Sequence, residues 1–141
     1  MTQTLIFRPL LAMILLTFIV ALYMLFTRFK AMKKLKIHPQ KGQDTAYLKT
    51  LLPDEVSRIS NNYNHLLEQP ILFYTLCFTL YILNAVDLAI LICSWAYVVL
   101  RILHTLTQVT KDIVLVRFFF FLMSWLPLGF MVALSIKHTL T

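Results

Sequence analysis

Long apolar segments separated by shorter polar ones dominate the pattern of this chain. Four segments are apolar enough for membrane-spanning helices: residues 9–27, 69–86, about 88–109 and 118–136. A bilayer core takes roughly 20 such residues, because lipid forces backbone polar groups into helical hydrogen bonds. The pattern predicts an all-α integral membrane protein with a single domain over residues 1–141. Its four-transmembrane-helix bundle is expected at about 7–28, 56–83, 86–109 and 113–138.

The connections between these segments differ in character. Residues 29–55 are polar and basic and predict a real loop, whereas 84–87 and 110–112 predict tight turns. Short turns make antiparallel neighbours, so the last three segments should form a compact up-and-down bundle. The composition agrees, since 60% of the residues are hydrophobic and 13% are charged, against about half and a quarter in soluble domains.

The net charge of +7 is concentrated in one place. Seven basic residues occupy the first connection: Arg28, Lys30, Lys33, Lys34, Lys36, Lys41 and Lys49. In a membrane protein, such a loop indicates orientation and contact with anionic lipid headgroups. We therefore expect a cytoplasmic basic loop, both termini on the opposite side and membrane lipids as partners, and we expect no nucleic acid. The two cysteines lie in apolar runs without ligand spacing, so no metal site is expected.

Polar residues interrupt the third apolar segment at helical spacing. Arg101, His104, Thr105 and Gln108 fall at i, i+3, i+4 and i+7, which places them on one stripe of a helix. An arginine inside a membrane costs at least about 2.5 kcal/mol on insertion scales, so it normally faces a bundle interior or a watery cavity. His104 taken alone is also typical of a hydrogen-bonded packing residue.

The second segment begins with a similar polar face. Arg58, either Asn61 or Asn62, and His65 are spaced i, i+3 or i+4, and i+7, and Glu68 follows on the same broad side. A further cation, Arg117, opens the fourth segment, where a snorkelling interfacial anchor is the alternative interpretation. Three arginines at similar depth need anions, and Glu68 alone cannot neutralise them. Either an anionic ligand or a headgroup phosphate satisfies this requirement.

Two stretches resemble a known family, the MAPEG proteins (membrane-associated proteins in eicosanoid and glutathione metabolism), and especially its bacterial branch. The first is NYNHLLEQPILFY, which includes Asn64, Glu68, Pro70 and Tyr74. The second is YVVLRILHTLTQVTKDIVLVRF, in which the spacing from Arg101 to Arg117 matches the family. The resemblance covers nearly the whole chain in length and segment order.

The resemblance implies a four-helix protomer, a homotrimer, and glutathione held between adjacent protomers. Arg58 and Asn62 match the family's Arg-x-x-x-Asn-x-x-Glu pattern, but His65 stands in the third place and Glu68 is the nearest carboxylate. The implied binding set is Arg58, Asn62, His65, Glu68, Arg101, His104 and Gln108, although Gln108 departs from the usual Tyr or His. Arg117 matches the arginine that contacts the glutathione sulfur in active members.

Two hypotheses follow from different functional classes. The first is a glutathione transferase or peroxidase of the bacterial inner membrane, which acts on a lipophilic small-molecule electrophile through a thiolate held by Arg117. The second is a non-catalytic trimeric membrane protein that binds lipid or a partner through the same polar cleft. Transport is the weakest alternative, because the chain shows no inverted repeat.

Overall fold

The structure is a computed structural model that describes residues 2–140, and this part of the chain is helical and contains no strand. Two short 3₁₀ helices are η1 (Gln3–Ile6) and η2 (Pro39–Gln43). The α-helices are α1 (Phe7–Lys34), α2 (Thr45–Leu51), α3 (Asp54–Glu68), α4 (Pro70–Ile82), α5 (Leu88–Val109) and α6 (Val114–Leu140). Three stretches are long and apolar enough to cross a membrane: Gln3–Lys34, Leu88–Val109 and Val114–Leu140. The expectation of an all-α membrane protein is confirmed.

The first helix is longer than predicted, since α1 continues to Lys34 instead of ending near residue 28. Residues 28–34 contain no Gly or Pro, and lysines in the last turn interact favourably with the helix dipole. The helix therefore extends beyond the end of the apolar segment, at which the sequence pattern predicts it to end. The helix stops where Lys36 adopts a left-handed conformation (φ 53°) and the Ile37 amide donates to the Met32 carbonyl at 2.9 Å.

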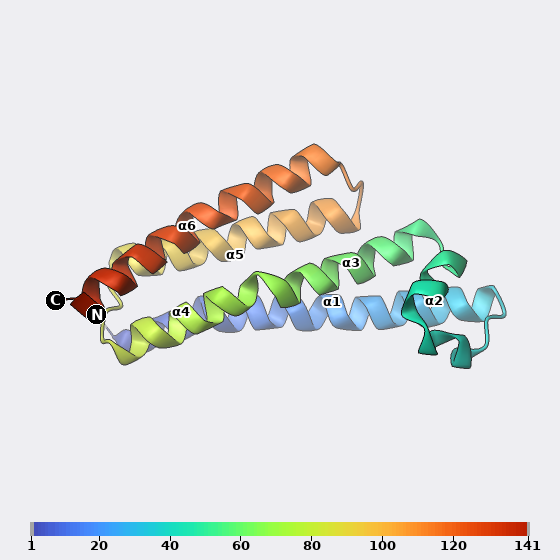
Figure 1. Cartoon of the computed structure of the whole chain (residues 1–141), viewed down its shortest axis with the longest axis horizontal. Helices are drawn as coiled ribbons and strands as arrows, with labels where there is room; N and C mark the ends of the chain where they lie inside the picture. Colours follow the sequence, from blue (N-terminus) through green and yellow to red (C-terminus); the bar gives the residue numbers. More distant parts are fainter. Residues whose placement is uncertain (1, 141) are drawn as a thin grey trace.

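The predicted loop 29–55 is also more structured than expected, because it contains η2 and α2. Asp44 caps α2 by accepting from the amides of Ala46 and Tyr47. A small second core holds α2 against the ends of α1 and α3; its buried side chains are Met32, Leu48, Leu52 and Val56. Figure 1 shows α2 folded back at this end of the molecule.

The predicted helix 56–83 consists of two helices, α3 and α4, joined through Gln69. Pro70 begins α4, and because proline has no backbone N–H it removes one helical hydrogen bond and bends the rod. The 13 residues of α4 correspond to about 20 Å, less than the roughly 30 Å bilayer core. A fourth crossing, which needs the last turns of α3 as well, stays a prediction.

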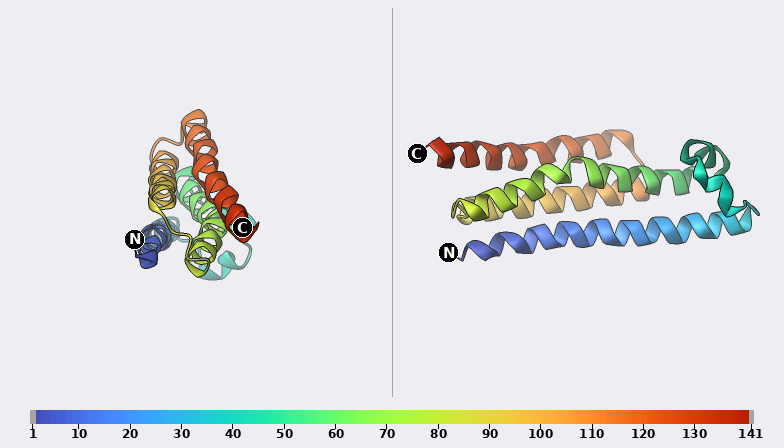
Figure 2. Two further views of the ribbon diagram at one scale, coloured as in Figure 1. Left: turned by 90° about the vertical axis from the view of Figure 1, so that its left-hand side faces the viewer. Right: turned by 60° about the horizontal axis from the view of Figure 1, so that its bottom comes forward.

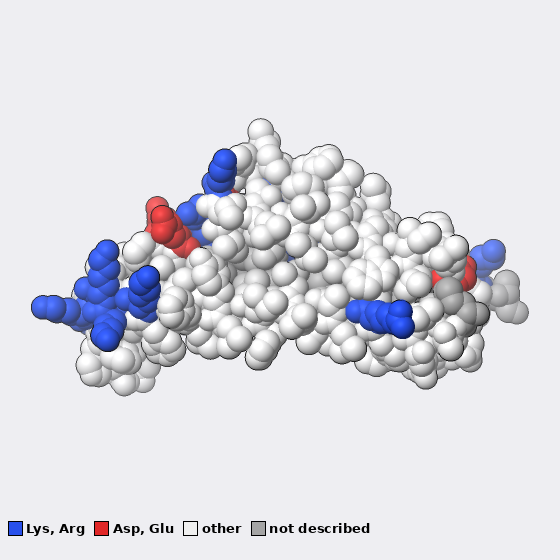
Figure 3. All heavy atoms as spheres, turned by 180° about the vertical axis from the view of Figure 1, so that it is seen from behind, with Lys and Arg blue, Asp and Glu red and all other residues white. Residues whose placement is uncertain are grey.

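The long helices form two antiparallel pairs, α1 with the α3–α4 rod and α5 with α6, as Figures 1 and 2 show. The pairs meet over a core in which the rings of Phe73 and Tyr97 stack at 4.5 Å. Large apolar side chains such as Phe26 and Phe118 are exposed on the outer surface. Figure 3 shows Lys and Arg gathered at one end of a largely uncharged face. This surface is suited to lipid.

Candidate functional site

The polar stripe of α5 faces the interior of the bundle. Arg101 is 0% exposed, and His104, Thr105 and Gln108 are also buried. Their common face follows from the helical spacing, and the polar side of α3 packs against it. The stripe therefore has side chains of α3 as its neighbours instead of lipid.

Arg101 is held by neutral oxygens alone. Its Nη1 donates to Oε1 of Gln69 at 2.9 Å, and its Nη2 donates to the backbone carbonyl of His65 at 3.1 Å. Ser124 on α6 also donates to Gln69 Oε1, at 3.2 Å. Within residues 2–140 no carboxylate pairs with Arg101, and its buried Nε has no partner. The guanidinium charge is thus compensated by dipoles and not by an acid.

Sequence reasoning missed Gln69 and Ser124. Ser124 is an isolated polar residue in an apolar context, and Gln69 opens the apolar run 69–86. The available signal for Gln69 was its spacing from Asn62 and His65, at i+7 and i+4, which continues the polar face of α3.

A second buried contact joins α3 to α5. The side-chain amide of Asn62 donates to Oε1 of Gln108 at 2.9 Å, and both residues are buried. The Oδ1 atom of Asn62 has no partner, and neither has the hydroxyl of Thr105. Buried polar atoms are nearly always hydrogen-bonded, so these orphans indicate room for a water molecule or a ligand atom.

Two histidines and one glutamate lie beside this contact. His65 Nδ1 lies 3.2 Å from Oε2 of Glu68, and the rings of His65 and His104 meet edge to face with centroids 6.1 Å apart. His104 also lies against Phe121, and its Nδ1 has no partner. Glu68 is exposed and is the carboxylate nearest to the buried arginine stripe along α3.

The remaining two arginines contact the α5–α6 turn. Arg58 donates to the backbone carbonyl of Thr110 at 3.0 Å. Arg117 forms an ion pair with Asp112, whose φ of 47° lies in the left-handed region. Both cations therefore already have oxygen partners within the chain.

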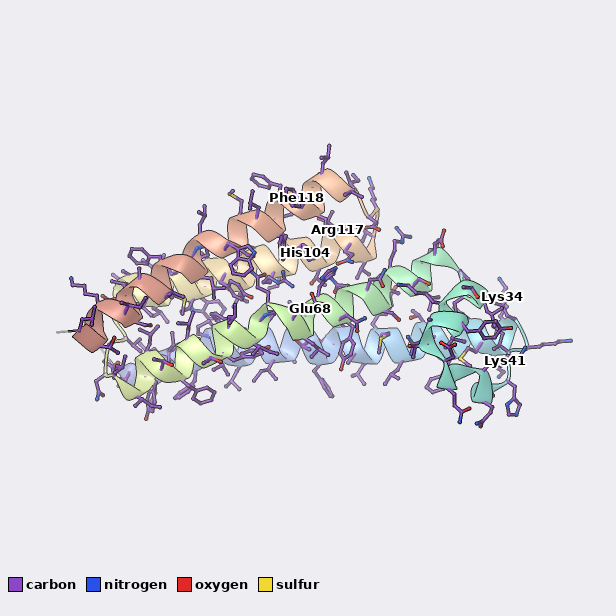
Figure 4. All side chains as sticks on the ribbon, in the orientation of Figure 1. Lys34, Lys41, Glu68, His104, Arg117 and Phe118 are labelled. Atoms are coloured by element: carbon purple, nitrogen blue, oxygen red, sulfur yellow. The ribbon has the colours of Figure 1, made fainter. Side chains whose placement is uncertain are left out.

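A pocket of 220 Å³ opens between α3, α5 and α6. It is lined by Asn61, Asn64, His65, Glu68, Gln108 and Arg117. Figure 4 shows Glu68, His104 and Arg117 on these three helices, away from the lysine-rich end. Four predicted residues thus line one pocket. Of the others, Asn62, Arg101 and His104 lie buried beside it.

Arg58 lies apart from this pocket. It lines a neighbouring one of 660 Å³ with the acidic residues Asp54, Glu55 and Asp112. The two pockets share Asn61. The predicted residues are therefore brought into one region, but they do not share one surface.

The fold and the site define a class: a helical membrane protein with a buried, arginine-bearing polar centre between its helices. The MAPEG family model matches residues 6–137, so the chain belongs to the MAPEG family and the resemblance seen in the sequence is confirmed. Membership makes it a membrane protein related to glutathione and eicosanoid metabolism. No curated protein and no solved structure gives a significant match.

Proposed function

We propose that this protein binds glutathione at the α3–α5–α6 pocket and transfers its thiolate to lipophilic electrophiles, as a glutathione transferase or peroxidase. One observation carries the proposal: Arg101 is fully buried beside the pocket and has no carboxylate partner within residues 2–140. A buried charge without an acid is costly. An anionic ligand would remove that cost.

The residues present suit the parts of the tripeptide. Its two carboxylates need cations: Arg101, buried beside the pocket, is the candidate for one, and Arg58 could serve the other only for a ligand that extends into the neighbouring pocket. Its α-amino group needs an acid, and Glu68 is the acid that lines the pocket. His65 holds that carboxylate in place at 3.2 Å, so the pair takes the role of the family glutamate.

Arg117 is the candidate for the thiol. A free thiol has a pKa of about 8.5, and a nearby cation lowers it; a shift of one unit corresponds to about 1.4 kcal/mol. The thiol releases its proton to water, and the resulting thiolate attacks the electrophilic carbon and forms a carbon–sulfur bond, while the leaving group departs with its electron pair. Before Arg117 can contact the sulfur, its ion pair with Asp112 has to break.

The size of the pocket supports assembly into a homotrimer. Small-molecule sites usually measure about 300 to 1,000 Å³, and this one measures 220 Å³. A wall contributed by a second protomer would complete it. The basic loop would then face the cytoplasm of a bacterial cell, with both termini across the inner membrane.

The second candidate is non-catalytic binding of lipid or a protein partner through the same polar cleft. The pairing of Arg117 with Asp112 and of Arg58 with Thr110 favours it, because both cations are already occupied. Under this alternative Arg117 has no role in thiolate formation.

Calorimetry on the purified protein in detergent tests the proposal. We expect glutathione to bind, Arg101→Gln to abolish binding, and Arg117→Ala to keep binding but lose the ultraviolet absorbance of the bound thiolate. Arg8→Ala, an exposed arginine outside the site, is the control and should behave as the wild type. No heat at millimolar glutathione overturns the proposal. Binding without any thiolate signal in the wild type favours the non-catalytic alternative.

A further inference from the structure

A groove between α1 and the α3–α4 rod joins two pockets of opposite character. The polar pocket measures 430 Å³ and includes Arg28, Lys49, Ser57, Ser60 and Asn61. The apolar pocket measures 450 Å³ and includes Ile14, Phe18, Ala21, Leu66 and Ile71. Tyr63 lines both pockets, so the two pockets adjoin at its side chain, and together they are called the groove.

The polar pocket has an excess of positive charge and hydrogen-bond donors. None of the residues that line it is Asp or Glu. Arg28 donates to the hydroxyl of Ser60 and Lys49 to the side-chain oxygen of Asn61, both at 2.7 Å, so each cation has a neutral partner. Arg28 Nε and Ser57 Oγ are buried without a partner. A group with a negative charge and several acceptor oxygens matches this set.

The apolar pocket extends from this set along α1. Ala21 and Ile14 precede Arg28 by 7 and 14 residues (28 − 21 and 28 − 14), which corresponds to about 10 and 21 Å of helix. One leaflet of the hydrocarbon core is roughly 15 Å deep, half of the bilayer core. The near end of the apolar pocket, at Ala21, therefore lies at the depth of an acyl chain whose headgroup is at Arg28, and its far end, at Ile14, reaches beyond the middle of the bilayer.

We infer that this groove is a specific site for an anionic glycerophospholipid, with its phosphate in the polar pocket and one acyl chain in the apolar pocket. The site lies mainly on the α1 side of α3 and the proposed glutathione pocket on the α5 side, and the two share Asn61 and Asn64 on α3. Free phosphate would use only the cations. An uncharged lipid would use only the apolar pocket. Because the two pockets adjoin at Tyr63, a molecule that has both parts would occupy both of them.

Native mass spectrometry of the detergent-solubilised full chain tests the inference with three probes. These are phosphatidylglycerol, diacylglycerol with the same chains, and glycerol phosphate without chains. We expect phosphatidylglycerol to be retained and the other two to bind far more weakly. Near an anionic headgroup each cation contributes about 5-fold in affinity, so Arg28→Gln with Lys49→Gln should weaken binding about 30-fold.

A matched control removes two charges outside the pocket. Lys34 and Lys41 lie at the same end of the molecule, as Figure 4 shows, but do not line the polar pocket. Lys34→Gln with Lys41→Gln should change binding less than about 3-fold. Ala21→Trp fills the apolar pocket and should weaken phosphatidylglycerol binding without changing that of glycerol phosphate.

Three results would overturn the inference. Equal losses in the two double variants would mean that only general surface charge attracts the lipid. Equal retention of diacylglycerol would remove the role of the cations. Equal retention of glycerol phosphate would make the groove a free phosphate site. Helical circular dichroism of each variant confirms that any loss is not due to unfolding.

Discussion

Replacing Gln69 with Leu tests how the charge of Arg101 is accommodated. The change removes the acceptor of Nη1 at 2.9 Å and leaves only the His65 carbonyl. Ser124 keeps its bond to the Phe121 carbonyl at 2.7 Å, so no second donor is orphaned. Hydrogen bonds to charged groups contribute about 1.5–3 kcal/mol, whereas interhelical polar contacts in a membrane protein average about 0.6. Because Arg101 is fully buried and unpaired by acids, we expect a loss of about 2 kcal/mol.

The free energy of unfolding is measured by titrating SDS into mixed micelles and following helical circular dichroism. Gln40→Leu, at an exposed glutamine in η2, is the control and should stay within about 0.5 kcal/mol of the wild type. A double-mutant cycle with Arg101→Met should give a coupling of about 1 to 2 kcal/mol. If Gln69→Leu is as stable as the wild type, or destabilises the Arg101→Met background equally, the argument that Gln69 stabilises the charge is refuted.

Three further variants test other contacts. Asp112→Asn should free Arg117 and increase the thiolate absorbance of bound glutathione several-fold; an unchanged spectrum would show that Asp112 does not restrain Arg117. Asp87→Ala should lower the free energy of unfolding by about 1 kcal/mol, since Asp87 caps the first turn of α5, and Asp87→Asn should retain most of it. Asn62→Leu should cost about 1 kcal/mol in the same titration, and adding Gln108→Leu should recover part of that loss because no buried amide is then left unpaired.

Helical periodicity explains what the sequence predicted well. The spacing of Arg101, His104, Thr105 and Gln108 placed them on one face, and all four are buried. The same argument placed Asn62 on the polar face of its helix, and in the structure Asn62 contacts Gln108 of α5. Such predictions succeed because the cost of charge in lipid forces a polar stripe toward protein.

Contacts between distant single residues were not predictable in this way. Gln69 contacts two residues that are distant in the sequence: Arg101, which is 32 positions further along the chain, and Ser124, which is 55 positions further along. Ser124 is isolated among the apolar residues of α6, and Gln69, although spaced i+4 from His65, opens the apolar run 69–86, so spacing did not identify either contact. Pro70 was visible in the sequence, but membrane helices tolerate proline when neighbouring groups satisfy the freed backbone. Whether Pro70 bends one helix or separates two depends on how the neighbouring helices pack, and the sequence pattern alone does not show that packing.

Residue spacing also cannot decide whether His65 or Glu68 replaces the family glutamate. Residues at i and i+3 lie on one face, so spacing alone assigns both to the pocket and selects neither. The structure places both on the pocket wall, 3.2 Å apart. We propose that the imidazole positions the carboxylate, so that the pair is the acid available to a ligand amine. His65→Phe should therefore weaken glutathione binding by misplacing Glu68, whereas His65→Glu should preserve it. Equal binding by the wild type and His65→Phe would show that Glu68 acts without its histidine.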